Sequence, residues 1–195
     1  MITSKRQNKI DNVIQRRQQG IIVLEDVHDP HNAAATMRSV EALGFQTVYF
    51  TFDKTKRYNP VTIGKASSAS AVKWLTIETF DSSKSCYQRL KQDGYIIYAT
   101  TLNPIKPYNV YDKLPTLGPK IAIVFGNEHA GLSSYAVDNA DYHLFIPMRG
   151  FVESFNISVC AALMLAEISR KRVEEGIGRY LLTKDQTQKL STKWK

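Results

Sequence analysis

The chain has 195 residues, with 26 Lys or Arg against 18 Asp or Glu and a formal net charge of +8. This length suits one domain with a substantial core. No run of about 18 apolar residues occurs, and the polar start lacks the apolar centre of a signal peptide, which excludes a membrane-spanning helix and leads us to expect a cytoplasmic protein. Cys86 and Cys160 are too few and too far apart for a disulfide framework or a metal cage.

Basic residues are concentrated at the two ends of the chain. Residues 1–20 hold five Lys or Arg against one Asp, and residues 170–195 hold eight against three acids, whereas the segment between them is close to neutral. Two basic ends on a near-neutral body are typical of a protein whose termini bind a polyanion such as RNA. Solvated tails, an acidic protein partner or a membrane surface are the alternatives on charge alone.

The first predicted element is a helix near the amino terminus. Apolar side chains recur at helical spacing from Ile10 to Ile14, which predicts a helix packed on the body of the protein. The same spacing predicts that Arg16 and Arg17 point outward.

Short apolar runs then alternate with helical patterns. Residues 21–27 predict a buried strand, and residues 32–44 predict a helix with Asn32 as its N-cap and Gly44 at its end. Further strands are expected at 47–52, 72–78, 95–101, 120–126 and 142–148, and further helices at 82–92, 132–140 and 154–175. Such alternation predicts an α/β fold with a mainly parallel sheet covered by helices on both faces.

Two stretches predict irregular structure. Residues 54–70 are polar and predict a long loop with one helical turn, and the proline-rich residues 103–119 predict a second. Neither a G-x-G-x-x-G nor a phosphate-binding G-x-x-x-x-G-K-[ST] motif follows any strand, which disfavours a nicotinamide dehydrogenase. A cofactor would therefore bind through other loops at the carboxyl ends of the strands.

The turn after the first strand carries the first cluster of polar residues. His28, His31 and Asp29 make a poor metal site, so we expect turn chemistry and no metal. Arg38 has small alanines as its helical neighbours, which leaves room for another surface to approach its stem. A surface ion pair with Glu41 is the alternative interpretation of Arg38.

A second cluster, in residues 125–134, follows a hydrophobic strand. Gly126 and Gly131 allow the backbone to turn sharply and approach a ligand. Glu128 lies between them, at the carboxyl end of a core strand, which is where open α/β sheets bind ligands. A simple turn carboxylate is the alternative.

The third cluster is "RGFVESFNIS", residues 149–158, before a largely apolar helix. Apolar residues surround that helix, which predicts burial against the sheet and a second subunit. A buried helix start needs a cap, which Ser154 or Asn156 can supply. One cap does not account for so many polar groups, so the helix start is also a candidate anion site.

Together, "DVHDPHNAAATMRSVEALGF", "IVFGNEHAGLS" and "IPMRGFVESFNISVCAALMLAE" resemble the three motifs of the SpoU/TrmH family of RNA 2′-O-methyltransferases, in the SPOUT superfamily. The likeness covers about residues 8–182 and is strongest to members that methylate a guanosine of the tRNA D-loop, of the guanosine-18 type. It implies a homodimer whose carboxyl-terminal part forms a deep trefoil knot. It also implies one methyltransferase domain, residues 1–195, with basic extensions at 1–20 and 170–195 that bind tRNA.

The resemblance also implies S-adenosylmethionine as cofactor and assigns functional residues. The catalytic set would be Arg38, Asn32, Ser154, Asn156 and Glu128. The cofactor would be bound by Gly126, Asn127, Glu128, Gly131, Ile146, Pro147, Met148, Ser154, Phe155 and Asn156. RNA would be bound by Arg16, Arg17, Arg38, Arg170, Lys171, Arg172 and Arg179.

The chain departs from the commoner family pattern at Glu153 and Phe155, which affects substrate detail more than activity. The resemblance to the SpoU/TrmH family gives Arg38 the central role in catalysis. A guanidinium is hard to deprotonate, so we expect Arg38 to pair with a phosphate and stabilise the developing alkoxide rather than act as a base. Ribosomal RNA as substrate, or a non-catalytic RNA-binding protein on the same scaffold, are the alternatives.

Overall fold

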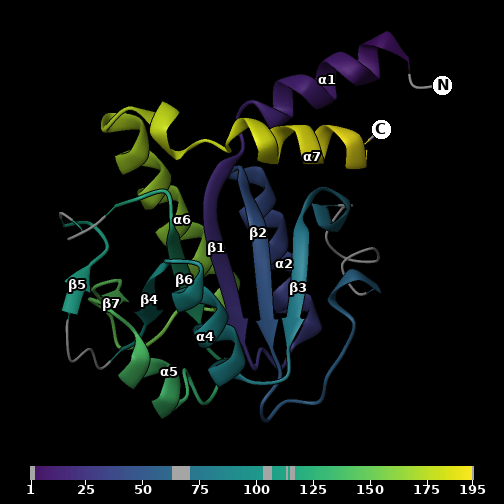
Figure 1. Cartoon of the computed structure of the whole chain (residues 1–195). Helices are drawn as coiled ribbons and strands as arrows, with labels where there is room; N and C mark the ends of the chain where they lie inside the picture. Colours follow the sequence, from purple (N-terminus) through teal and green to yellow (C-terminus); the bar gives the residue numbers. More distant parts are fainter. Residues whose placement is uncertain (1–2, 63–70, 103–106, 113, 115–116, 195) are drawn as a thin grey trace.

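The computed structural model describes residues 3–62, 71–102, 107–112, 114 and 117–194. A seven-stranded sheet, all of whose neighbouring strands are parallel, forms its centre, in the order β3-β2-β1-β6-β4-β7-β5 (Figure 1). The strands are β1 (Gln18–Glu25), β2 (Phe45–Thr51), β3 (Thr76–Phe80), β4 (Ile96–Thr100), β5 (Pro107–Asn109), β6 (Ile121–Phe125) and β7 (Tyr142–Phe145).

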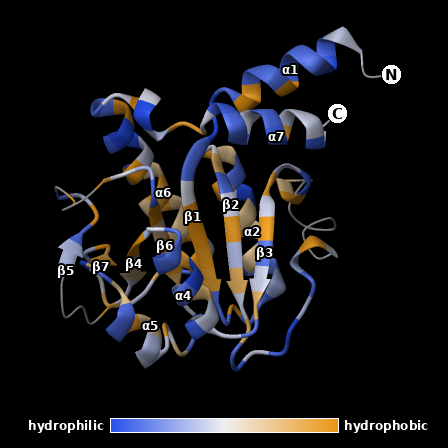
Figure 2. Cartoon of the chain, viewed as in Figure 1, coloured by the Kyte–Doolittle hydropathy of each residue, from blue (hydrophilic) through white to orange (hydrophobic). Residues whose placement is uncertain are grey.

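Helices cover both faces of this sheet, as the sequence predicts. The helices are α1 (Ser4–Ile14), α2 (Pro30–Ala42), α4 (Ser83–Gln92), α5 (Ser134–Asn139), α6 (Ile157–Glu174) and α7 (Lys184–Trp194), with short 3₁₀ helices η1 (Ala71–Trp74) and η2 (Ile177–Tyr180). On one face, side chains of α2 and α6 pack with Leu24 of β1; on the other, those of α4 and α5 pack with its neighbour Val23. Successive residues of a strand face opposite sides of the sheet, and helices cover both sides. The central strands are therefore apolar along continuous runs, as Figure 2 shows.

Several predicted boundaries differ from the structure. The N-cap of α2 is Asp29, whose carboxylate accepts from the His31 backbone N–H, because Pro30 starts the helix; Asn32 lies inside the first turn. Gly44 ends the helix as expected, with φ +82. Residues 71–74 form η1 instead of the start of a strand, and β7 ends at Phe145.

Strand β5 was not expected. It lies in the stretch predicted to be irregular, and pairs with β7 at the edge of the sheet. Of the two predicted loops, residues 63–70, 103–106, 113, 115 and 116 lie outside the described residues.

The two ends of the chain meet at the amino ends of the strands. Helices α1 and α7 lie side by side there, whereas the arrows of β1, β2 and β3 point away from them (Figure 1). Ile10 and Ile14 of α1 pack with Leu190 and Trp194 of α7. The predicted apolar face of the first helix is thus confirmed, with α7 as its partner. No helix among the described residues is long and apolar enough to cross a membrane.

Two arginines predicted to bind RNA are buried. Arg17 is 1% exposed, forms an ion pair with Glu41 at 2.6 Å and lies over the Trp194 ring. Arg172 is fully buried, donates to the Gln19 carbonyl oxygen at 2.6 Å and stacks on Tyr180. The outward prediction for Arg17 is wrong. In this structure neither guanidinium is accessible to a phosphate, because both side chains are buried.

The predicted burial of α6 against the sheet is confirmed, whereas its predicted burial against a second subunit is not tested by a single chain. Ala161, Leu165 and Ile168 are fully buried against α2 and the sheet. Val159 and Leu163, on another face of the helix, are 45% and 38% exposed. One apolar face of α6 is therefore available for a second molecule.

Candidate active site

Three loops meet at the carboxyl edge of the sheet. One follows β1 and leads into α2; a second follows β6, the neighbour of β1; the third, residues 146–156, leads into α6. Adjacent parallel strands bring their following loops together at one edge, where open α/β sheets bind ligands. This edge lies at the opposite end of the strands from α1 and α7 (Figure 1).

A chain of hydrogen bonds joins the three loops. Asn32 of α2 donates through Nδ2 to Glu128 Oε1 at 3.0 Å, and Asn156 donates through Nδ2 to Asn32 Oδ1 at 3.0 Å. Glu128 also accepts from the backbone N–H groups of His28 at 3.0 Å and Asp29 at 3.3 Å. The side chain of Asn32 thus binds both the loop after β6 and the third loop.

These hydrogen bonds hold Glu128 as a carboxylate. Partial burial favours the neutral acid, but the bonds donated by Asn32, His28 and Asp29 outweigh it and place the pKa of Glu128 below its usual value. The edge therefore carries a fixed negative charge at neutral pH.

The loop after β6 is unusually tight. Asn127 and Gly131 exchange backbone hydrogen bonds of 2.9 and 3.0 Å. The Asn127 side chain accepts through Oδ1 from the His129 backbone N–H at 2.9 Å and donates through Nδ2 to the Asp26 carbonyl oxygen at 2.7 Å. Gly131 has φ +67. A Cβ on Gly126 would lie 2.4 Å from the carbonyl carbon of Gly131, so only glycine fits there.

The third loop is bound to α6 by its last residue. Asn156 is the N-cap of α6 and accepts from the Ser158 backbone N–H at 2.9 Å. Residues 147–155 form no hydrogen bond with any other described residue, so their backbone groups are open to a ligand. Ile146 is buried and Pro147 and Met148 are half-buried, whereas Ser154 and Phe155 are exposed.

Arg38 is not part of this cluster in the single chain. It lies six residues after Asn32 on α2 and is exposed, and its side chain forms no hydrogen bond or ion pair with a described residue. The alternative that it pairs with Glu41 is wrong, because the Glu41 carboxylate binds Arg17. Asn32, Glu128 and Asn156 are brought together as predicted, while neither Arg38 nor Ser154 is bonded to them.

One residue of this edge escaped prediction. Asp26, directly after β1, has φ 50 and accepts the backbone N–H groups of residues 53–55 at 2.8 to 3.1 Å through its Oδ1. It joins the turn after β2 to the loop after β1. An Asp at a strand end is a known turn residue, but the sequence does not show that its partners lie in the turn after another strand.

The remaining predicted RNA contacts differ in exposure. Arg16 is exposed, and its Nε donates only to the Asn12 carbonyl oxygen. Arg170 and Arg179 are exposed but form ion pairs with glutamates of their own segment. Lys171 is mostly buried and donates to the carbonyl oxygens of residues 111 and 112. The burial of Lys171 makes it a poor phosphate ligand.

Open parallel α/β domains bind ligands at the carboxyl ends of their strands. This edge carries a carboxylate and backbone groups that form no hydrogen bond with described residues, so the fold and the site are those of that class. The chain belongs to the SpoU rRNA Methylase family, whose model matches residues 19–166. It is 36% identical to a tRNA (guanosine(18)-2'-O)-methyltransferase of Borreliella burgdorferi, over 99% of this chain and 85% of the relative. It is 32% identical to the protein of the same name from Thermus thermophilus, over 98% and 96%.

Solved structures agree with the fold. The structure described as the Aquifex aeolicus TrmH/SpoU tRNA modifying enzyme matches with a TM-score of 0.84 and 29% identity, over 97% of this chain and 94% of that chain. The SpoU methyltransferase AviRb of Streptomyces viridochromogenes, in complex with AdoMet, matches with a TM-score of 0.69 over 84% and 64% of the chains. At 22% identity the second match shows the fold alone.

Proposed function

We propose that this protein is an RNA ribose 2′-O-methyltransferase that transfers a methyl group from S-adenosylmethionine to a guanosine of the tRNA D-loop, of the guanosine-18 type. The observation that carries the proposal is the hydrogen-bonded chain from Glu128 through Asn32 to Asn156, which assembles all three family motifs at one edge. Relatives named for this reaction, at 30% identity or more over nearly the whole chain, support the choice of tRNA.

The residues present suit S-adenosylmethionine. Free backbone groups in residues 147–155 and the loop closed by Gly126 and Gly131 can bind its polar parts, and the apolar Ile146 can contact a flat ring. Bound there, the cofactor supplies a methyl group on a cationic sulfonium. The Glu128 carboxylate gives the edge the opposite charge.

The reaction forms an oxygen–methyl bond while a sulfur–methyl bond breaks, and the 2′-hydroxyl proton leaves to phosphate or water. A neutral ribose hydroxyl is a weak nucleophile, so its oxygen must be held close and in line. Arg38 binds the neighbouring phosphate and stabilises the developing negative charge on that oxygen. Ser154, Asn156 and the N-terminus of α6 orient the phosphate or Arg38.

The assembly proposed for this reaction is a homodimer, acting in the cytoplasm, with the trefoil knot of the SPOUT fold. Exposed apolar side chains extend from the third loop along one face of α6: Phe151, Val152, Phe155, Val159 and Leu163. Such a patch on a surface is typical of a protein interface. A second copy seated on it would reach the site, and Arg38 could meet Ser154 and Asn156 across that contact.

The direct test supplies purified protein with labelled S-adenosylmethionine and separate pools of unmodified tRNA and ribosomal RNA. Label is expected in tRNA, on the 2′-oxygen of a D-loop guanosine, as mapped by its resistance to alkaline cleavage. Label only in ribosomal RNA would show that ribosomal RNA, and not tRNA, is the substrate. Failure to bind S-adenosylmethionine would favour a non-catalytic RNA-binding protein.

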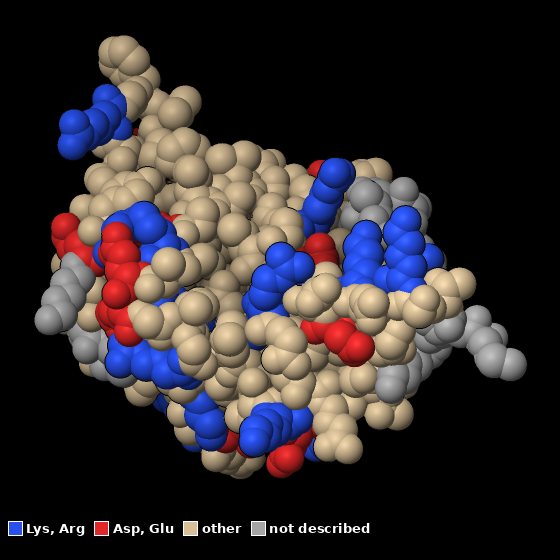
Figure 3. All heavy atoms as spheres, turned by 90° about the horizontal axis from the view of Figure 1, so that it is seen from above, with Lys and Arg blue, Asp and Glu red and all other residues tan. Residues whose placement is uncertain are grey.

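The basic ends form the proposed tRNA surface. Lys and Arg side chains stand out along the end of the molecule that carries α1 and α7 (Figure 3). Among the exposed lysines that form no ion pair with described residues are Lys5 of α1 and Lys184, Lys189 and Lys193 of α7. They replace the buried Arg17 and Arg172 as the expected phosphate ligands.

Replacing these four lysines by glutamine is expected to weaken tRNA binding and lower its salt dependence. Each phosphate that is no longer bound reduces the slope of log K against log salt by roughly 0.7 to 0.9. The measurement is tRNA affinity at several salt concentrations, with S-adenosylmethionine affinity unchanged. The matched control replaces Lys84, Lys91 and Lys120, which lie elsewhere. Equal slopes in both variants would show that the terminal helices do not contact the RNA.

Asn156 has two roles that one substitution separates. Asn156→Ser keeps a good N-cap for α6 but is too short to donate to Asn32. We expect the melting temperature to change little and methyl transfer to fall, because the third loop is no longer held to Asn32. Asn156→Ala should also lose about 1 kcal/mol of stability, the usual contribution of a cap. Full activity of the serine variant would show that the cap alone matters.

A further inference from the structure

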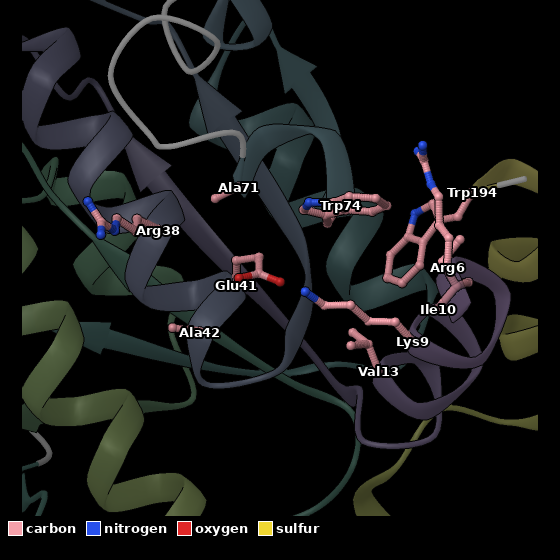
Figure 4. Close-up of a pocket in the computed structure, with 10 residues that line it drawn as sticks. All are labelled: Arg6, Lys9, Ile10, Val13, Arg38, Glu41, Ala42, Ala71, Trp74 and Trp194. Carbon is pink, nitrogen blue, oxygen red and sulfur yellow. The ribbon is translucent and has the colours of Figure 1, made fainter. Parts of the chain in front are cut away.

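A cavity lies away from the carboxyl edge, under the terminal helices. Its volume is about 610 Å³, within the usual range of small-ligand sites. It lies between α1, α2, η1 and α7 (Figure 4). Figure 4 shows Arg38 and Ala71 at one end, Arg6, Ile10 and Trp194 at the other, and Trp74 with Glu41 between them.

The cavity is positively charged. Arg6, Lys9 and Arg38 line it, and all three side chains are exposed. Glu41, the acid in the wall, is bound to Arg17 at 2.6 Å, so its charge is already neutralised. The wall therefore offers three cations to an anion, spread along the length of the cavity.

The cavity is also aromatic. Trp74 and Trp194, the only two tryptophans of the chain, both line it, with ring centroids 5.2 Å apart at 79°. Trp74 is half-buried, so part of its ring is accessible. Trp194 is 6% exposed, and its buried Nε1–H has no hydrogen-bond partner among the described residues.

We propose that this cavity binds an unpaired nucleotide of the RNA substrate, next to the ribose that is methylated; this rests on the function proposed above. The base stacks on Trp74, and flanking phosphates bind Arg6, Lys9 and Arg38. Aromatic rings interleaved with cations are the usual means of binding single-stranded RNA. A base held in this way must be unstacked from its neighbours, which selects a loop rather than a duplex.

Helix α2 connects this subsite to the active site. Asn32, in the first turn of α2, belongs to the carboxyl-edge cluster, and Arg38 lines the cavity six residues later. At a rise of about 1.5 Å per residue, the two are roughly 9 Å apart along the helix axis. Arg38 is therefore the shared residue: the phosphate it binds lies between the nucleotide in the cavity and the target ribose.

Intrinsic fluorescence tests the proposal directly, because both tryptophans line the cavity. In Trp194→Phe, Trp74 is the sole tryptophan emitter. An unmodified tRNA transcript is expected to quench this emission with the same midpoint as its binding, and S-adenosylmethionine alone is expected to leave it unchanged. RNA binding without quenching would overturn the proposal. A change in emission that depends on protein concentration without RNA would do so too, since a second copy would then occupy the cavity.

Affinity measurements with Trp74 variants give an independent readout. Trp74→Leu should bind the transcript roughly 10-fold more weakly, the scale of removing the stacking of one base. Trp74→Phe keeps a ring and should keep most of the affinity, whereas Tyr111→Leu, an exposed aromatic elsewhere, should bind like the parent. The effect should appear in KM for tRNA with S-adenosylmethionine affinity unchanged. If the parent methylates tRNA and Trp74→Leu does so with the same KM, the subsite fails and the proposed function stands.

Discussion

Replacing Arg38 by lysine should lower the rate of methyl transfer about 10²- to 10³-fold, the usual effect of losing one donor to a developing oxyanion. Lysine keeps the positive charge but lacks the planar pair of donors that can bind a phosphate and a ribose oxygen together. The fold should be unaffected, because the Arg38 side chain is exposed and forms no bond with a described residue. Turnover of tRNA at saturating S-adenosylmethionine measures the effect, with thermal unfolding beside it.

Arg89→Lys is the matched control. Arg89 is an exposed helical arginine on α4, in the layer on the other face of the sheet, and forms a surface ion pair with Asp93. Its replacement should leave both activity and melting temperature close to those of the parent, because such pairs contribute little. Near-full activity of Arg38→Lys would show that positive charge alone is sufficient, and would refute the two-donor role.

The structure explains why Arg38 is available for such a role. Glu41 lies three residues later on the same helix, at a spacing that would allow an ion pair with Arg38. The carboxylate instead binds Arg17, and the Glu41 carbonyl oxygen also accepts from Arg17 at 3.0 Å. A buried arginine of the amino-terminal segment thereby removes the competing acid from Arg38.

The sheet was predictable because short runs of apolar, β-branched residues are typical of buried strands. Buried parallel strands must be apolar on both faces, and β1, β2 and β6 show that in their sequences. The order of strands was not predictable, because it depends on which crossovers pass over which face. Strand β5 lacks an apolar run, since it is a three-residue edge strand that begins with proline.

The candidate site was predictable in composition but not in its contacts. Asn32 and Glu128 follow strands that turned out to be neighbours, and polar residues at such strand ends indicate a ligand site. The sequence suggested that Asn32 caps its helix, because a capping residue and a residue that joins two loops have the same chemical type. Only the fold shows that Asn32 bonds both Glu128 and Asn156.

The charge at the chain ends predicted the individual RNA-binding residues less well. Counting Lys and Arg treats every cation as exposed, yet Arg172 is fully buried and contacts Gln19, Gly118 and two aromatic rings. Burial lowers the pKa of Arg172 to about 10, which still leaves it charged at neutral pH. Such arginines hold the terminal segments against the sheet, and it is the helices so positioned that present the exposed lysines.

Replacing Gly126 by alanine should damage both cofactor binding and catalysis. The added Cβ would lie 2.4 Å from the Gly131 carbonyl carbon and 2.5 Å from its oxygen, and both are backbone atoms that no side-chain rotation can move. The loop held by the paired hydrogen bonds of Asn127 and Gly131 must then open. A displacement of about 1 Å at a reacting centre costs roughly 10²-fold in rate, so we expect a decrease of at least that size.

The same substitution should cost about 1–3 kcal/mol of folding free energy, as other overpacked sites do, and weaken S-adenosylmethionine binding measured by calorimetry. Gly178→Ala is the matched control, because a Cβ there has no atom within 4 Å. Its stability and cofactor affinity should equal those of the parent. Unchanged cofactor affinity in Gly126→Ala would mean that the closed turn after β6 does not shape the binding site, and the assignment of Gly126, Asn127 and Gly131 to the cofactor would fail.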